Sequence, residues 1–163
     1  MTPTDQRVRV HPDGIDDVSV EESPEFGGLD LPMGERVGLP GRGTTFFRYV
    51  EGPKGAPTVV LLHGWVTSGG MNFFKAFGPL SEHFNVIAPD LRGHGRGIRS
   101  WRRFRLADCA DDVAALIEHL DCGPVIAAGY SMGGPVAQLL WRRHPELVSG
   151  LVLAATGTWL VPG

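Results

Sequence analysis

The fold is decided by the stretch Pro124-Val125-Ile126-Ala127-Ala128-Gly129-Tyr130-Ser131-Met132-Gly133-Gly134, which reads as a buried strand that turns directly into a helix. Within it, Gly129-x-Ser131-x-Gly133 is typical of a nucleophile elbow, a tight turn with a serine at its tip. Larger side chains at the two glycines would collide with the neighbouring strand and helix. The serine backbone is strained there, and its hydroxyl projects beside helix N-terminal N–H groups that suit a developing oxyanion.

The surrounding pattern decides between this interpretation and an ordinary glycine-rich turn, because the chain holds 23 glycines. After a hairpin-like segment over 35–51, apolar runs at 58–62, 85–89, 125–128 and 150–155 alternate with helix-like patterns at 72–83, 106–120 and 132–144. This alternation predicts an α/β fold with a mainly parallel sheet and flanking helices.

Local signals give three further expectations. Gly78-Pro79 is expected to break the helix over 72–83, and Gly123 to cap the helix over 106–120. The uninterrupted apolar run over 150–155 predicts a buried final strand.

Three motifs follow predicted strands directly. They are His63-Gly64-Trp65, Asp90-Leu91-Arg92-Gly93-His94-Gly95 and the turn at Ser131. Functional groups of α/β proteins gather at the carboxyl ends of parallel strands, so we expect these motifs to meet at one edge of the sheet.

In this order and spacing, the three motifs resemble those of the α/β-hydrolase superfamily, in its serine hydrolase and esterase-like branch. The resemblance covers roughly residues 36–157 and implies that Ser131 is the nucleophile. It further implies that the backbone N–H groups of Trp65 and Met132 form the oxyanion hole. The implied reaction is hydrolysis of a carboxylic ester or related acyl bond of a small molecule through an acyl-enzyme. A serine at the tip argues against the epoxide hydrolase and haloalkane dehalogenase branches, which use a carboxylate.

The chain departs from the family after the nucleophile, where an acid and a histidine normally follow. The only acid after Ser131 is Glu146 and the only histidine is His144. Both lie about 20 Å of helix away, so neither can serve. We therefore expect residues 34–163 to be the N-terminal part of an α/β-hydrolase domain without its C-terminal strands, inactive alone. A cofactor-free perhydrolase, a carbon–carbon bond hydrolase and a truncated non-catalytic module stay open as alternatives.

Other polar residues near the expected site have structural interpretations. His63 and His94 are expected to shape loops, and Asp90 to accept hydrogen bonds from backbone donors. Five arginines follow in a run broken by Trp101 and Phe104: Arg96, Arg99, Arg102, Arg103 and Arg105. We expect a solvated loop partly neutralised by Asp108, Asp111 and Asp112. A loop that borders the substrate mouth and favours anionic substrates is the alternative hypothesis.

Composition limits the remaining classes. Residues 1–33 are acidic and proline-rich, which predicts a mostly disordered leader. The net charge of −3 and the absence of a long apolar run favour no nucleic-acid or membrane partner. Cys109 and Cys122 are too far apart along one helix for a disulfide and lack metal-ligand spacing. We therefore expect a cytoplasmic protein without cofactor or metal, of unspecified oligomeric state.

Overall fold

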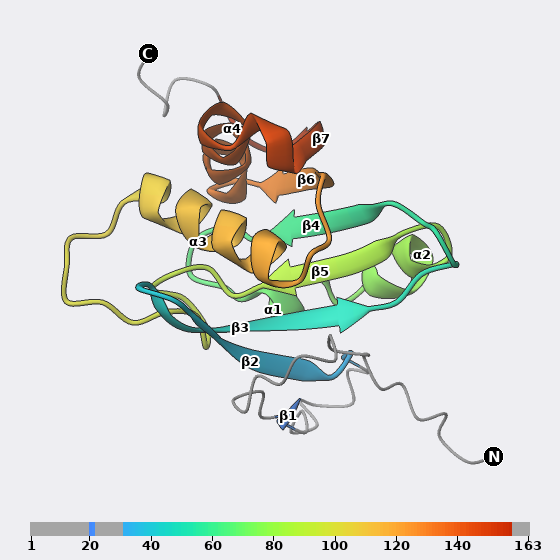
Figure 1. Cartoon of the computed structure of the whole chain (residues 1–163), viewed down its shortest axis with the longest axis horizontal. Helices are drawn as coiled ribbons and strands as arrows, with labels where there is room; N and C mark the ends of the chain where they lie inside the picture. Colours follow the sequence, from blue (N-terminus) through green and yellow to red (C-terminus); the bar gives the residue numbers. More distant parts are fainter. Residues whose placement is uncertain (1–19, 22–30, 158–163) are drawn as a thin grey trace.

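A seven-stranded sheet with the order β1-β2-β3-β5-β4-β6-β7 runs through the part of the chain that the computed structural model describes, residues 20–21 and 31–157 (Figure 1). The strands are β1 (Val20–Glu21), β2 (Gly34–Leu39), β3 (Gly43–Val50), β4 (Thr58–Leu62), β5 (Asn85–Pro89), β6 (Val125–Tyr130) and β7 (Val148–Ala154). The helices are α1 (Gly69–Phe73), α2 (Phe77–Ser81), α3 (Leu106–His119) and α4 (Gly133–Arg143), followed by the 3-10 turn η1 (Pro145–Leu147).

The sheet has a parallel half and an antiparallel half. Strands β5, β4, β6 and β7 are parallel neighbours. The β2–β3 hairpin joins them through an antiparallel pairing of β3 with β5. The α/β class with a mainly parallel sheet and flanking helices is therefore confirmed.

Strand β4 shows how both faces of the sheet are covered. Its alternate residues Val60 and Leu62 belong to the core beneath α3 and α4. Val59 and Leu61 belong to a second core that includes Phe77 of α2. Because successive strand side chains point to opposite faces, an unbroken apolar run marks a strand that is buried on both sides.

Helix α3 carries the apolar stripe that the sequence predicts, but its cap differs from the prediction. Asp121, not Gly123, takes the left-handed conformation after the helix, with a φ of 47°. The Asp121 N–H donates to Glu118 O at 3.1 Å, and the Cys122 N–H donates to Ile117 O at 3.3 Å. This pattern is a Schellman motif, which aspartate supports because it tolerates positive φ better than most residues.

The helical region after β4 begins earlier and breaks at a different place than expected. Ser68 caps α1 by accepting a hydrogen bond from the Met71 N–H, so the helix starts at Gly69. The break falls between Phe73 and Phe77, and Pro79 lies in the first turn of α2. Proline is tolerated there because the first turn of a helix has no intrahelical partner for its N–H.

Strand β7 is an exposed edge strand, so the expectation of a buried final strand is wrong. Val152 and Leu153 are 53% and 42% exposed. Within the described residues β7 has β6 as its single neighbour, which leaves its other edge uncovered.

The predicted leader lies mostly outside the described residues. Two of its residues, Val20 and Glu21, pair with Glu35 and Gly34 of β2. None of the described helices is long and apolar enough to cross a membrane.

Candidate active site

Ser131 occupies the turn between β6 and α4 and has a φ of 50°, in the left-handed region. Its N–H donates to Ala154 O of β7 at 3.0 Å, and its carbonyl accepts from the Gly134 N–H at 3.0 Å. These two bonds fix the backbone of a residue whose conformation is unfavourable for most L-amino acids.

The glycines around Ser131 are required by close backbone contacts. A Cβ on Gly129 would lie 2.2 Å from Gly133 O, and a Cβ on Gly133 would lie 1.9 Å from Leu62 O of β4. Real Cβ atoms do not approach backbone oxygens so closely, so a side chain at either position would push the helix away from the sheet. The collisions predicted from the sequence are confirmed.

The loop after β4, His63-Gly64-Trp65, lies against the same turn. A Cβ on Gly64 would be 3.2 Å from the Tyr130 ring and 3.5 Å from Ser131 Cβ. The Gly64 N–H donates to Asn72 Oδ1 of α1 at 2.9 Å, which fixes the loop to that helix. Sequence reasoning missed Asn72, since an asparagine inside a short helix carries no local signal of such a role.

His63 is completely buried and has both ring nitrogens engaged. Nε2 accepts from the Leu91 N–H at 2.9 Å, which leaves Nδ1 to donate to Gly64 O at 2.7 Å. Burial lowers the pKa of His63 below its ordinary value. The structural interpretation of His63 is confirmed, because a neutral ring with both nitrogens occupied has no lone pair for a substrate proton.

Asp90 joins two loops at the carboxyl end of β5. Its Oδ1 accepts from the Gly69 N–H, and its Oδ2 accepts from the Arg96 N–H, both at 2.8 Å. The predicted role as an acceptor for backbone donors is confirmed.

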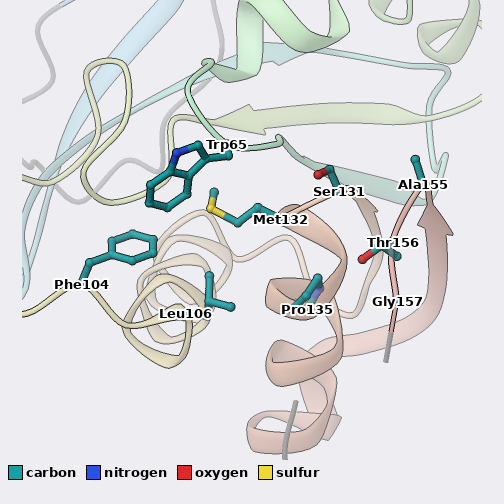
Figure 2. Close-up of a pocket in the computed structure, with 9 residues that line it drawn as sticks. All are labelled: Trp65, Phe104, Leu106, Ser131, Met132, Pro135, Ala155, Thr156 and Gly157. Carbon is teal, nitrogen blue, oxygen red and sulfur yellow. The ribbon is translucent and has the colours of Figure 1, made fainter. Parts of the chain in front are cut away.

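A pocket of about 600 Å³ opens beside Ser131 (Figure 2). One wall is mainly apolar, and the other is the chain just after β7. The lining residues are Trp65, Phe104, Leu106, Ser131, Met132, Pro135, Ala155, Thr156 and Gly157. Figure 2 shows Met132 between Trp65 and Ser131, with Ala155 and Thr156 on the other side of the serine.

Trp65 and Phe104, which line the apolar end of this pocket, form an aromatic cluster with His94. Its ring centroids are 4.9 Å apart for Trp65 and His94, 5.4 Å for Trp65 and Phe104, and 5.8 Å for His94 and Phe104. All three pairs meet edge to face, a favourable arrangement for aromatic rings. The cluster therefore holds the loop after β4 against the loop after β5, as expected of a histidine that shapes loops.

Backbone strain concentrates around the pocket. Val66, Ser131 and Ala155 have φ angles of 57°, 50° and 48°. Val66 follows Trp65, and Ala155 lines the pocket wall. Positive φ is unusual for non-glycine residues and often marks functional sites, so the strain adds weight to this pocket.

His144 and Glu146 lie at the far end of α4, which is about 16 Å long. His144 Nε2 is 2.9 Å from Asp111 Oδ1, a carboxylate that also accepts two bonds from Arg143. Among the described residues, no histidine hydrogen-bonds to Ser131. The prediction that His144 cannot serve this serine is confirmed.

The acidic residues of α3 have partners other than the expected ones. Asp111 binds Arg143 and His144, while Asp112 binds Arg42 and Arg92. The expectation that these two aspartates neutralise the arginine run is therefore wrong.

The described part of the chain also contains no group of three or more His, Cys, Asp or Glu side chains arranged to hold a metal ion.

A family model described as the alpha/beta hydrolase fold matches residues 57–162. A bifunctional esterase/perhydrolase of Acinetobacter calcoaceticus is 36% identical over 109 residues, which are 64% of this chain and 38% of that protein. A putative esterase/lipase of Haemophilus influenzae is 34% identical over 111 residues, which are 66% of this chain and 37% of that protein.

Among solved structures, a hydrolase from Pseudomonas aeruginosa superposes with a TM-score of 0.70 at 29% identity. The match covers 78% of this chain and 47% of that one. The chain thus spans less than half the length of each of these three proteins.

Proposed function

The chain belongs to the α/β-hydrolase superfamily, and we propose that it carries the nucleophile of a serine hydrolase that cleaves a carboxylic ester or a related acyl bond of a small molecule. The observation that carries this proposal is the position of Ser131, at a left-handed turn beside the pocket. The relatives whose names include esterase support the same class of reaction.

We assign the oxyanion hole to the backbone N–H groups of Met132 and Trp65. Met132 is the N-cap residue of α4, where the first N–H groups of a helix lack intrahelical acceptors. Trp65 follows Gly64, which lies against Ser131 and is held by Asn72. Two N–H donors that are fixed before the substrate arrives stabilise a developing negative charge without reorganisation.

In the proposed reaction, Ser131 Oγ attacks the acyl carbon and passes its proton to a general base. The tetrahedral oxyanion collapses, and the alcohol leaves with that proton. Water then attacks the acyl-enzyme in the same way and releases the carboxylic acid. Because no described histidine reaches Ser131, we propose that the base and its partner acid come from outside the described residues.

A second candidate is a cofactor-free perhydrolase, favoured by the name of the Acinetobacter relative. Hydrogen peroxide would attack the acyl-enzyme in place of water and release a peracid. Both reactions use the same Ser131 adduct, so product analysis with and without peroxide distinguishes them.

A boronic acid tests Ser131 and the two N–H donors without requiring a general base. Phenylboronic acid adds reversibly to a serine oxygen: the hydroxyl proton is released to solvent, and the boron becomes tetrahedral and anionic, which shifts its ¹¹B resonance. We expect saturable binding with a tetrahedral signal in the 163-residue chain and loss of that signal in Ser131→Ala. Equal signals in both proteins would overturn the assignment of Ser131.

We also propose a cytoplasmic location. Cys109 and Cys122 are free thiols, as reducing compartments maintain. Burial raises the pKa of Cys109 to about 12 and that of Cys122 to about 11, so neither is a reactive thiolate at neutral pH.

A further inference from the structure

The segment of residues 99–105, here named the arginine loop, projects from the body of the molecule between β5 and α3 (Figure 1). Trp101 lies within it with a relative exposure of 107%, so its indole touches almost nothing. Four arginines of the loop are also exposed: Arg99, Arg102, Arg103 and Arg105.

The positive charge of the arginine loop is not compensated by ion pairs. The sequence has no acidic residue from position 91 to 107. Arg99 donates to the carbonyl of Gly95, which satisfies a donor but leaves the charge. Across the described residues, the carboxylates of Asp111 and Asp112 bind other cations, and none forms an ion pair with the four exposed arginines.

The tripeptide Trp-Arg-Arg occurs twice in the chain and shows how unusual this loop is. Its second copy, residues 141–143, lies on α4, where Trp141 is 53% exposed and Arg143 is bound to Asp111. The same three residues thus lie on a regular helix with one arginine in an ion pair in one place, and in an exposed loop that has no ion pair among the described residues in the other.

We propose that the arginine loop docks on an anionic lipid surface, with Trp101 in the headgroup region and the four arginines against lipid phosphates. Tryptophan prefers the membrane interface because its ring is apolar and its N–H polar. Arginines near an anionic bilayer each add about 1 kcal/mol of attraction, which is about a fivefold gain in partitioning. Surface docking needs no helix that crosses the bilayer.

A single-stranded nucleic acid is the competing partner for exposed arginines and an aromatic ring. Such sites align several aromatic platforms along a basic groove. Here the seven-residue loop contains a single exposed aromatic ring, that of Trp101, so the lipid surface fits better. The same loop carries Phe104, which lines the pocket beside Ser131. Docking therefore brings the pocket close to the bilayer, in which apolar acyl compounds dissolve.

The test measures partitioning of the 163-residue chain onto vesicles by sedimentation at about physiological ionic strength. One set of vesicles is pure phosphatidylcholine, and the other contains phosphatidylglycerol. The test variant carries both Trp101→Ala and Arg102→Gln. The matched control carries both Trp141→Ala and Arg142→Gln, which change the same residue types and the same charge. We expect binding to anionic vesicles that falls at least about fivefold in the test variant, from the lost arginine charge alone, and stays within twofold in the control.

A second measurement uses brominated lipids, which quench the fluorescence of an inserted indole. We expect Trp101→Phe to abolish the quenching and Trp141→Phe to retain it. An equal loss of vesicle binding in the test variant and in the control would overturn the proposal. Equal binding of the unchanged chain to neutral and anionic vesicles would also overturn it. Binding of a labelled single-stranded oligonucleotide without vesicle binding would overturn it in favour of the nucleic acid.

Discussion

The Nε2 atom of His63 accepts a hydrogen bond of 2.9 Å from the backbone N–H of Leu91, and this bond ties the loop after β4 to the loop after β5. Both loops contribute to the aromatic cluster at the end of the pocket through Trp65 and His94. His63, which lies next to the candidate site in the sequence, is thus a buried side chain that links two loops.

Replacing His63 by alanine is expected to lower the free energy of unfolding by about 2–4 kcal/mol. The change leaves the buried Leu91 N–H without an acceptor and removes a ring from the core. Urea titration measures the loss, with His83→Ala as the control because His83 is exposed. If His63→Ala lowers the free energy of unfolding no more than the control does, the link that His63 makes between the two loops contributes nothing to stability.

His63 should also make stability depend on pH. Burial lowers its pKa in the folded protein, so the unfolded chain binds a proton first as the pH falls below about 6.5. The free energy of unfolding is therefore expected to decrease from pH 7.5 to pH 5. The decrease should be shallower in His63→Gln, which does not titrate. Parallel pH profiles for the two proteins would contradict this assignment.

The glycines of the Ser131 turn should not tolerate a methyl group. Gly133→Ala places a Cβ 1.9 Å from Leu62 O, and Gly129→Ala places one 2.2 Å from Gly133 O. Each is expected to cost about 3 kcal/mol or more, because backbone must move. The control is Gly38→Ala, whose Cβ would meet nothing within 4 Å and which should change stability by no more than about 1 kcal/mol. Thermal unfolding of the three variants measures the difference.

The neighbouring aspartates of α3 should differ strongly in their effect on stability. The Asp112 side chain is 7% exposed and binds both Arg42 and Arg92, so Asp112→Asn leaves two poorly solvated arginines and is expected to cost about 3 kcal/mol. The Asp111 side chain is 19% exposed and pairs with the more exposed Arg143, so Asp111→Asn should cost about 1 kcal/mol or less. Urea titration in low and high salt tests the contrast, and equal costs would refute it.

Ser131 in the 163-residue chain is expected to react with a fluorophosphonate no faster than in the urea-denatured chain. Its hydroxyl has no histidine partner among the described residues, and an unactivated serine is a weak nucleophile. Mass spectrometry of the labelled peptide measures the reaction, with Ser131→Ala as the blank. Stoichiometric labelling of the folded chain would reveal a general base within these 163 residues.

Much of the architecture was predictable because it rests on local patterns. The apolar run over 58–62 and the stripe of α3 each carry a period that identifies strand or helix without reference to the rest of the chain. The glycines at 129 and 133 likewise predicted a turn too tight for side chains. Ser68 and Asp121 show the limit, since a side-chain cap and a left-handed aspartate set helix ends that glycine and proline signals misplaced.

The candidate site was predictable only in part. Ser131 and Trp65 follow from motifs at strand ends, and the alternative hypothesis of a loop that borders the substrate mouth includes Phe104, which lines the pocket. Asn72 and Thr156 come from elements whose local sequences say nothing about a pocket. The ion pairs of Asp111 and Asp112 were also misjudged. Nearness in sequence favoured the arginine run as the partner of these aspartates. The packing of α3 against its neighbours instead brings Arg42 to Asp112 and Arg143 to Asp111.

The sequence by itself determined the α/β alternation and the tight turn at Ser131, because hydrophobic periodicity and the space available to a glycine are local properties of the chain. Only the tertiary structure decided that His63 is a neutral ring that links two loops, and that Asp111 and Asp112 are already paired. It also decided that the exposed arginines around Trp101 form no ion pair with the described residues. Those outcomes depend on which distant atoms meet in three dimensions, since burial and hydrogen bonding across the sheet set the charge and the availability of each side chain.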